Sequence, residues 1–95
     1  MDDEEIRARL LLTLLRHHKW GESHTAYEHL FRQFKSEALG KAGLKYVKNI
    51  ADDLMKKGLI IRKPTSYGLQ VSLNPQKAHI IKNLIEEKLG FRFQS

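Results

Sequence analysis

The side chains with the clearest chemical potential in this sequence are the lysines and arginines between positions 41 and 63. This segment carries seven basic residues against two acidic ones, a net charge of +5, whereas residues 1–40 carry −1 and residues 64–95 carry +2 of the formal +6 of the chain. The basic residues are Lys41, Lys45, Lys48, Lys56, Lys57, Arg62 and Lys63. Positive charge gathered on one segment is typical of a surface that binds a polyanion. The alternative for these lysines is a face that is merely solvated.

Histidines are a second source of chemistry, because the chain holds five of them. His17 and His18 are adjacent, and His24 and His29 are five positions apart. A zinc site on a helix uses histidines four positions apart, which places both side chains on one face. The observed spacing therefore does not indicate a metal site, and we expect no cofactor.

Ser23, His24 and Glu28 could be drawn as a hydrolytic set, but a simpler role explains this segment. Thr25 to Glu28 fits a capping box, in which the threonine hydroxyl accepts from the backbone N–H three residues on and the glutamate reaches back. No nucleophile elbow accompanies these residues. The absence of cysteine excludes a thiol nucleophile, a disulfide and a thiolate metal site. We therefore expect no enzymatic activity.

Length and composition predict one globular domain over residues 1–95. The chain is 41% hydrophobic and 29% charged, which are ordinary values for a folded domain. The longest apolar run, residues 10–12 with Leu14 and Leu15, is far below the roughly 18 residues of a membrane span. This run follows four acidic residues, unlike a signal peptide. We expect a soluble, cytoplasmic protein without a membrane partner.

Hydrophobic periodicity and capping residues predict the helices. The predicted helices span residues 2 to about 19–21, 25 to about 35, about 44–57, and 75–89. Asp2 or Asp3 caps the first helix, and Asn74 caps the last. Gly58 and Gly90 follow the last turns of the third and fourth helices, where a left-handed residue closes a helix.

The third helix is amphipathic, and a hairpin follows it. At 100° per residue its apolar positions fall within a sector of about 140°. Its polar outer face carries Lys45, Asn49, Asp52 and Lys56. Residues 59–61 and 69–73 have the composition and alternation of strands, and residues 64–68 form a tight loop between them. We therefore predict a β-hairpin directly after the basic helix.

Three helices, a two-stranded hairpin and a closing helix are the element order of a winged helix-turn-helix domain, an α+β fold that is mostly helical. Residues 45–60 resemble the recognition helix of winged-helix regulators of the MarR-like group, in which a periodic helix ends in Leu-x-x-x-Gly-Leu-Ile and enters the wing. Residues 65–68 and 71–75 are similar to small uncharacterised archaeal winged-helix proteins. The resemblance covers nearly the whole chain, which is shorter than MarR-like proteins and lacks their long flanking dimer helices.

The resemblance implies that the first half of the third helix faces the major groove of DNA. The matching outward residues are Lys45, Tyr46, Lys48 and Asn49, with Lys41 before them. Asn49 is the best candidate for reading a base, because amide side chains pair bidentately with adenine, whereas lysines reach guanine or phosphate. Asp52 projects from the same face and would repel phosphate unless Lys48 or Lys56 holds it.

The resemblance also implies contacts outside the third helix. The free backbone N–H groups at the start of the second helix would bind a phosphate. The residues at that point are Ser23, His24 and Thr25, and the base of the wing carries Arg62 and Lys63. The wing tip is short and uncharged, and its candidate contacts are Ser66 and Tyr67. For Tyr67 we expect packing on its own strands rather than stacking on a base.

Double-stranded DNA is the partner that these features favour, with a role as a transcriptional regulator or a chromatin-associated factor. Two alternatives remain open: a protein-interaction adaptor on the same scaffold, and a protein that binds structured RNA or single strands. A homodimer through the final helix is also a hypothesis, because its apolar arc is wider than one core contact needs. The candidate interface residues are Ile80, Leu84, Phe91 and Phe93. Alternatively, the two phenylalanines fold back over the core.

Overall fold

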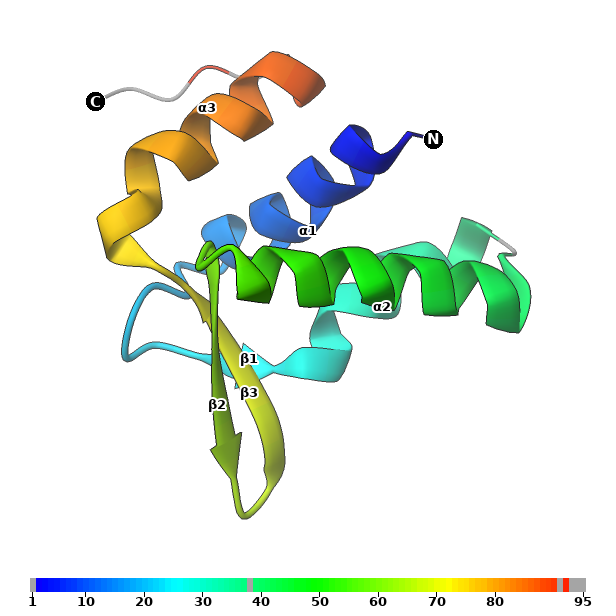
Figure 1. Cartoon of the computed structure of the whole chain (residues 1–95), viewed down its shortest axis with the longest axis horizontal. Coiled ribbons are helices and arrows are strands. Elements are labelled where there is room, and N and C mark those ends of the chain that lie inside the picture. The colour runs from blue at the N-terminus through cyan, green and yellow to red at the C-terminus, as the bar shows by residue number, and fades with distance from the viewer. Residues whose placement is uncertain (1, 38, 91, 93–95) are drawn as a thin grey trace.

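The computed structural model describes residues 2–37, 39–90 and 92, and it shows an α+β protein that is mostly helical, as predicted. In chain order the elements are α1 (Asp3–Arg16), β1 (Thr25–Ala26), the 3₁₀ helix η1 (Tyr27–Glu37), α2 (Gly40–Lys56), β2 (Ile60–Thr65), β3 (Gly68–Leu73), the short 3₁₀ helix η2 (Pro75–Lys77) and α3 (Ala78–Leu89). The described strands form one antiparallel sheet in the order β1-β3-β2. In Figure 1 the hairpin of β2 and β3 extends away from the helices.

The first helix, α1, begins where the sequence predicts and ends slightly earlier. Asp2 caps it, since its carboxylate accepts a hydrogen bond of 2.7 Å from a backbone N–H in the first turn. The helix ends at Arg16 because the chain turns at His18, which has a φ of 54°. The carbonyl of Lys19 then accepts from the N–H of Leu73 at 2.7 Å. Because the carbonyl of Lys19 is bonded to the end of β3, the chain at this point follows the sheet and does not continue the predicted helix.

The second predicted helix differs most from the structure. Thr25 and Ala26 form the strand β1, in which Thr25 lies opposite Val71 of β3. The predicted capping box is therefore wrong: the helix is 3₁₀ and starts at Tyr27. The Thr25 hydroxyl lies 3.2 Å from Nδ1 of His29 instead. The reason is that pairing with a distant strand engages the backbone that a local cap would have left free.

The predicted hairpin is confirmed, and its first strand is longer than predicted. The paired register runs from Ile60 opposite Leu73 to Thr65 opposite Gly68. Because β2 is an edge strand, Pro64 is accommodated without loss of a bond to a further strand.

The predicted ends of the third and fourth helices at Gly58 and Gly90 are confirmed, whereas the fourth helix starts at Ala78 rather than at Pro75, which begins η2. Gly58 follows α2 with a φ of 77°, and Gly90 follows α3 with a φ of 76°. The side chain of Asn74 accepts from the N–H of Gln76 at 3.0 Å and donates to the carbonyl of Gly58 at 2.9 Å. This asparagine therefore caps η2 and ties it to the end of α2.

The core lies between the helices and the sheet, with α1 packed between α2 and α3 (Figure 1). Its fully buried large side chains include Leu10, Leu14, Leu30, Phe34, Val47, Leu54, Ile60, Val71, Leu73, Ile81 and Ile85. Trp20 packs against this core. Within the described ranges, no helix has both the length and the apolar character needed to cross a membrane.

Candidate nucleic-acid interface

Helix α2 presents one side to the core and the opposite side to solvent. Its buried side chains are Val47, Ile50, Ala51 and Leu54. At 100° per residue the opposite sector, about 80° wide, holds five residues that are all exposed. These are Lys41, Lys45, Asn49, Asp52 and Lys56, and we call them the outer face of α2. Lys45 lies at its centre and Asn49 at its edge, and the sequence predicts a contact with a ligand for both.

Two other predicted contacts of this helix lie on its flanks. The ammonium of Lys48 is 3.8 Å from the carboxylate of Glu28 and 5.5 Å from the ring centroid of Phe31, so this side chain lies against η1. Tyr46 lies on the other flank, where its hydroxyl donates to the carboxylate of Asp3, and this hydrogen bond raises the pKa of the phenol. The resemblance groups Tyr46 and Lys48 with Lys45, but neighbouring elements hold both to the sides of the helix.

Asp52 is the acidic residue of the outer face, and a tyrosine holds it rather than a lysine. Its carboxylate accepts a hydrogen bond of 3.2 Å from the hydroxyl of Tyr27 at the start of η1. Burial of the phenol, followed by the charge of Asp52, raises the pKa of Tyr27, which therefore stays a protonated donor at neutral pH. The expected pairing of Asp52 with Lys48 or Lys56 is not found among the described ion pairs.

The cations of the segment 41–63 fall into two groups. One group has carboxylate partners: Lys48 lies 3.8 Å from Glu28, Lys57 lies 3.0 Å from Asp53, and Lys63 lies 3.9 Å from Glu22. The other group has no carboxylate of a described residue within ion-pair distance. Its members are Lys41, Lys45, Lys56 and Arg62, and all four are exposed. These four charges are therefore available to an anion.

A hollow of about 450 Å³ joins the outer face of α2 to the hairpin. Its lining residues are Tyr27, Asp52, Met55, Lys56, Arg62 and Leu69. Lys56 from the helix and Arg62 from β2 thus line the same hollow, with apolar atoms between them. Lys56 was not among the predicted contacts, although its helical angle, close to that of Lys45, was a signal that could have found it.

The predicted phosphate site at Ser23, His24 and Thr25 loses its structural basis. The N–H of Ser23 donates to the carbonyl of Trp20 at 3.0 Å, within a turn. Thr25 belongs to β1, and the following helix begins two residues later. These residues therefore do not form the N-terminus of a helix, and no helix dipole points at them.

The hairpin tip holds the next two candidates, Ser66 and Tyr67. The hydroxyl of Thr65 donates to the carbonyl of Gly68 at 2.7 Å and accepts from the N–H of Tyr67 at 3.2 Å. Tyr67 is 93% exposed, so the expectation that it packs on its own strands is wrong. The backbone N–H of Tyr67 takes part in the turn, while its phenol ring is exposed to solvent.

The structure describes two of the four candidate dimer residues, Ile80 and Leu84. Ile80 on α3 is 48% exposed, whereas Leu84 is half-buried and packs against the core. Phe91 and Phe93 lie outside the described residues. Of the predicted set, Ile80 is the residue that the described structure leaves accessible.

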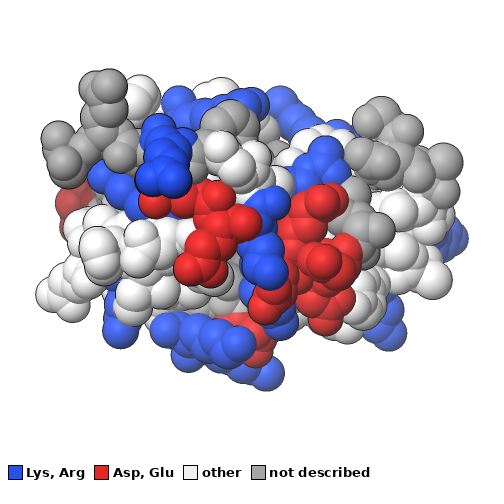
Figure 2. Space-filling view, turned by 90° about the horizontal axis from the view of Figure 1, so that it is seen from above, with Lys and Arg blue, Asp and Glu red and all other residues white. Residues whose placement is uncertain are grey.

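The face opposite the hairpin has mixed charge. Figure 2 looks down on the side where the N-terminus of α1 and the helix α3 lie, and acidic and basic side chains alternate across it. The first turn of α1 contributes three acidic residues, and Glu4 pairs with Lys88 of α3. Arg7 lies 3.9 Å from Asp53 of α2. A polyanion would meet carboxylates on this side.

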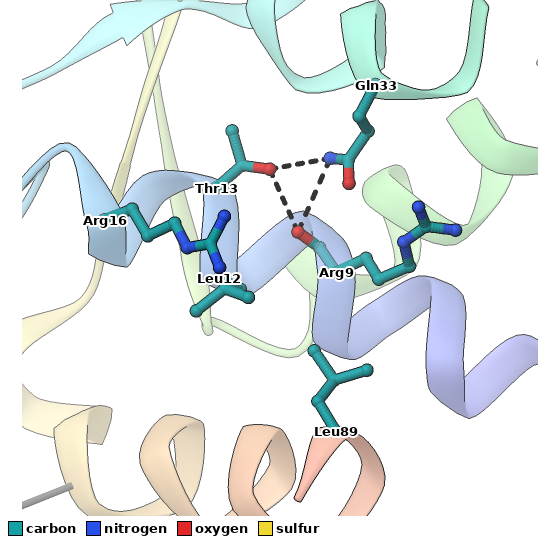
Figure 3. A pocket seen from close by; sticks show the side chains of 6 residues that line it. All are labelled: Arg9, Leu12, Thr13, Arg16, Gln33 and Leu89. Carbon is teal, nitrogen blue, oxygen red and sulfur yellow. Dashed lines mark hydrogen bonds between the residues drawn. The ribbon is translucent and has the colours of Figure 1, made fainter. Parts of the chain in front are cut away.

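A second hollow, of about 440 Å³, lies between α1, η1 and the end of α3 (Figure 3). Gln33 donates to the hydroxyl of Thr13 at 2.6 Å and to the carbonyl of Arg9 at 3.4 Å, and the Thr13 hydroxyl donates to the same carbonyl at 3.0 Å. The guanidinium of Arg9 lies 5.4 Å from the ring centroid of Phe34. These polar groups join α1 to η1, so their geometry is explained by the fold.

Two histidines meet between α1 and η1. The ring centroids of His17 and His29 are 5.1 Å apart, at an interplanar angle of 43°. Burial, followed by the charge of Arg32, lowers the pKa of His29. Among the residues that the structure describes, no three His, Cys, Asp or Glu side chains are placed to hold a metal ion.

Comparison of this chain with protein-family models, with curated proteins and with solved structures gives no match. The function must therefore be argued from the residues and their geometry.

Proposed function

We propose that this chain is a winged-helix protein that binds double-stranded DNA, as a transcriptional regulator or a chromatin-associated factor. In this proposal the outer face of α2 enters the major groove, and the hairpin of β2 and β3 is the wing. One observation carries it: Lys41, Lys45, Lys56 and Arg62 are exposed on α2 and the adjoining hairpin, without a described carboxylate in ion-pair distance.

The order of the elements supports the proposal. The helices α1, η1 and α2 precede the hairpin, and α3 follows it, as the resemblance predicts. The core fixes α2 through four buried side chains, so the helix is held firmly while its outer face remains free. A fixed helix with a free polar side is what docking into a groove requires.

The dimensions of α2 suit a major groove. Its 17 residues give a length of about 25 Å at 1.5 Å per residue. The groove is about 12 Å wide, which matches the diameter of a helix with its side chains. Asn49, an exposed residue of the outer face, is the proposed reader of an adenine, and Lys41 and Lys45 are the proposed contacts to phosphate or guanine.

Asp52 limits how the helix can dock. Its carboxylate would face phosphates if it pointed straight outward, but the hydrogen bond from Tyr27 directs it toward η1. The proposed base contacts therefore come from the residues of α2 that precede Asp52. Lys56 and Arg62 then bind the DNA backbone beside the hollow that they line.

A homodimer would supply the second half-site that one recognition helix lacks. A single helix reads only a few base pairs, and paired domains read sites about one turn of DNA apart. Ile80 is an exposed residue of α3. The helix α3 lies on the side of the molecule away from the hairpin tip (Figure 1). We propose α3 as the contact between two copies.

A salt titration of binding tests this function. The logarithm of the binding constant for a duplex should fall linearly with the logarithm of salt concentration, because neutralised phosphates release counterions. Matched single-stranded DNA and a structured RNA serve as comparison ligands at each salt concentration. Preference for either comparison ligand would favour the RNA or single-strand alternative. No measurable binding to any of the three at low salt would favour the protein-interaction adaptor.

A further inference from the structure

Tyr67 differs from every other exposed large apolar side chain in the described structure. Its exposed fraction is 93%, whereas the others lie between 37% and 49%. Both faces of its ring are therefore open to a ligand. It stands at the end of the hairpin that is farthest from the helices (Figure 1).

The turn that carries Tyr67 is well fixed. Two residues, Ser66 and Tyr67, connect the paired residues Thr65 and Gly68. The Thr65 hydroxyl accepts from the N–H of Tyr67 and donates to the carbonyl of Gly68, and Gly68 has a φ of 111°. Neither Ser66 nor Tyr67 has a positive φ, so this turn does not require asparagine, aspartate or glycine at these two positions and accepts a tyrosine. The hydrogen bonds of the turn are made by the Thr65 hydroxyl and the backbone, and the phenol ring extends into solvent.

The length of the hairpin sets where the ring can reach. Five steps along β2 at about 3.3 Å each place the tip about 17 Å from Ile60 at the base. One turn of DNA is about 34 Å, so the tip lies about half a turn from the proposed site of α2. The ring therefore reaches either the adjacent minor groove or the nucleotides that follow the end of a duplex.

The chemistry of the hairpin tip fits the nucleotides beyond the end of a duplex better than the minor groove. Minor-groove binders carry arginine or lysine, and an aromatic wedge between paired bases must unstack them. The tip residues 64–68 are uncharged, and the nearest cation along β2, Lys63, lies 3.9 Å from the carboxylate of Glu22. An unpaired base offers its face without the cost of unstacking, and aromatic stacking on it needs no charge.

We propose that Tyr67 stacks on an unpaired base beside the duplex that α2 holds. The preferred ligand is then a duplex with a single-stranded overhang or fork, rather than a continuous duplex. This inference rests on the proposed function, since α2 must position the duplex before the tip can meet the unpaired base.

Binding of a blunt duplex, compared with the same duplex carrying a short 5′ or 3′ overhang, tests the inference. The first unpaired position carries 2-aminopurine, whose fluorescence is quenched by stacking. We expect one overhang polarity to bind roughly 5- to 140-fold more tightly than the blunt duplex, the range given by one stacked base. Tyr67→Ala should remove this preference and the quenching while leaving blunt-duplex affinity unchanged, because the side chain is exposed.

Two control variants separate stacking from other causes. Tyr67→Phe keeps the aromatic face and should keep the preference, whereas Tyr67→Leu keeps apolar area only and should lose it. Gln76→Ala alters an exposed side chain on η2, outside the hairpin, and should change nothing. Equal binding of blunt and overhang duplexes by the wild type would overturn the inference while leaving the proposed function intact. Equal losses on both duplexes in Tyr67→Ala would also overturn it, by assigning Tyr67 to the intact duplex. Absence of all duplex binding would instead reject the proposed function.

Discussion

Replacing Lys41 and Lys45 together by alanine should weaken duplex binding in a way that depends steeply on salt. Both side chains are exposed on the outer face of α2, one turn apart, and neither has a described carboxylate within ion-pair distance. We assign one phosphate to each. Since each contact contributes about 0.9 to the slope of log K against log salt, the double variant should have a slope shallower by about 1.8.

This change in slope fixes the expected loss of affinity. If the electrostatic contribution vanishes near 1 M salt, the loss should be about 30-fold at 0.15 M salt, which corresponds to about 2 kcal/mol. At 0.05 M salt the loss should rise to about 200-fold, and at 0.5 M it should fall to about 3-fold. Fluorescence anisotropy with a labelled duplex measures all three points.

A matched control removes two charges elsewhere. Lys77→Ala with Lys82→Ala lowers the net charge equally, but on η2 and α3. We expect this variant to keep nearly the wild-type slope. The reasoning is refuted if a folded Lys41 and Lys45 variant keeps the wild-type slope. It is also refuted if the control variant loses as much affinity, because then only net charge matters.

Three further predictions follow from named side chains. Asn49→Ala should cost about 1–3 kcal/mol on the preferred site and almost nothing on random DNA, and equal losses on both would reduce Asn49 to a backbone contact. Ile80→Glu should convert a homodimer into a folded monomer in sedimentation, and a wild type that is already monomeric at high concentration would reject the dimer. The lowered pKa of His29 means that the folded state binds this proton less well than the unfolded state, so the contribution to stability is present above the ordinary value of 6.5 and is lost as the pH falls below it. His29→Gln should therefore reduce the drop in thermal midpoint between neutral and mildly acidic pH, and an unchanged drop would contradict this.

The parts of the fold that local signals specify could be predicted from the sequence. Asp2, Asn74, Gly58 and Gly90 act through hydrogen bonds or backbone angles within a few residues, and all four lie at the predicted helix ends. The start of η1 could not be predicted in this way. Thr25 has the sequence of a helix cap, but its pairing with β3 depends on residues far along the chain, which local patterns do not report.

The candidate site was predictable to a similar degree. Helical angles correctly gave the exposed positions of α2, including Lys45 and Asn49. The same angles place Lys48 and Tyr46 on the flanks of the helix, but they could not show that Glu28 and Asp3, from other elements, would contact these side chains there. Such contacts depend on tertiary packing, so the sequence alone predicted a wider contact surface on α2 than the structure leaves free.

Backbone amide chemical-shift mapping during titration with a short duplex tests the central claim most directly. The proposal predicts that the perturbed amides concentrate on α2 around Lys45 and Asn49 and on β2 around Arg62, with little change on α3. Perturbation centred on the hollow near Leu12 and Leu89, with α2 unchanged, would contradict the assignment of the outer face of α2 as the DNA-binding surface.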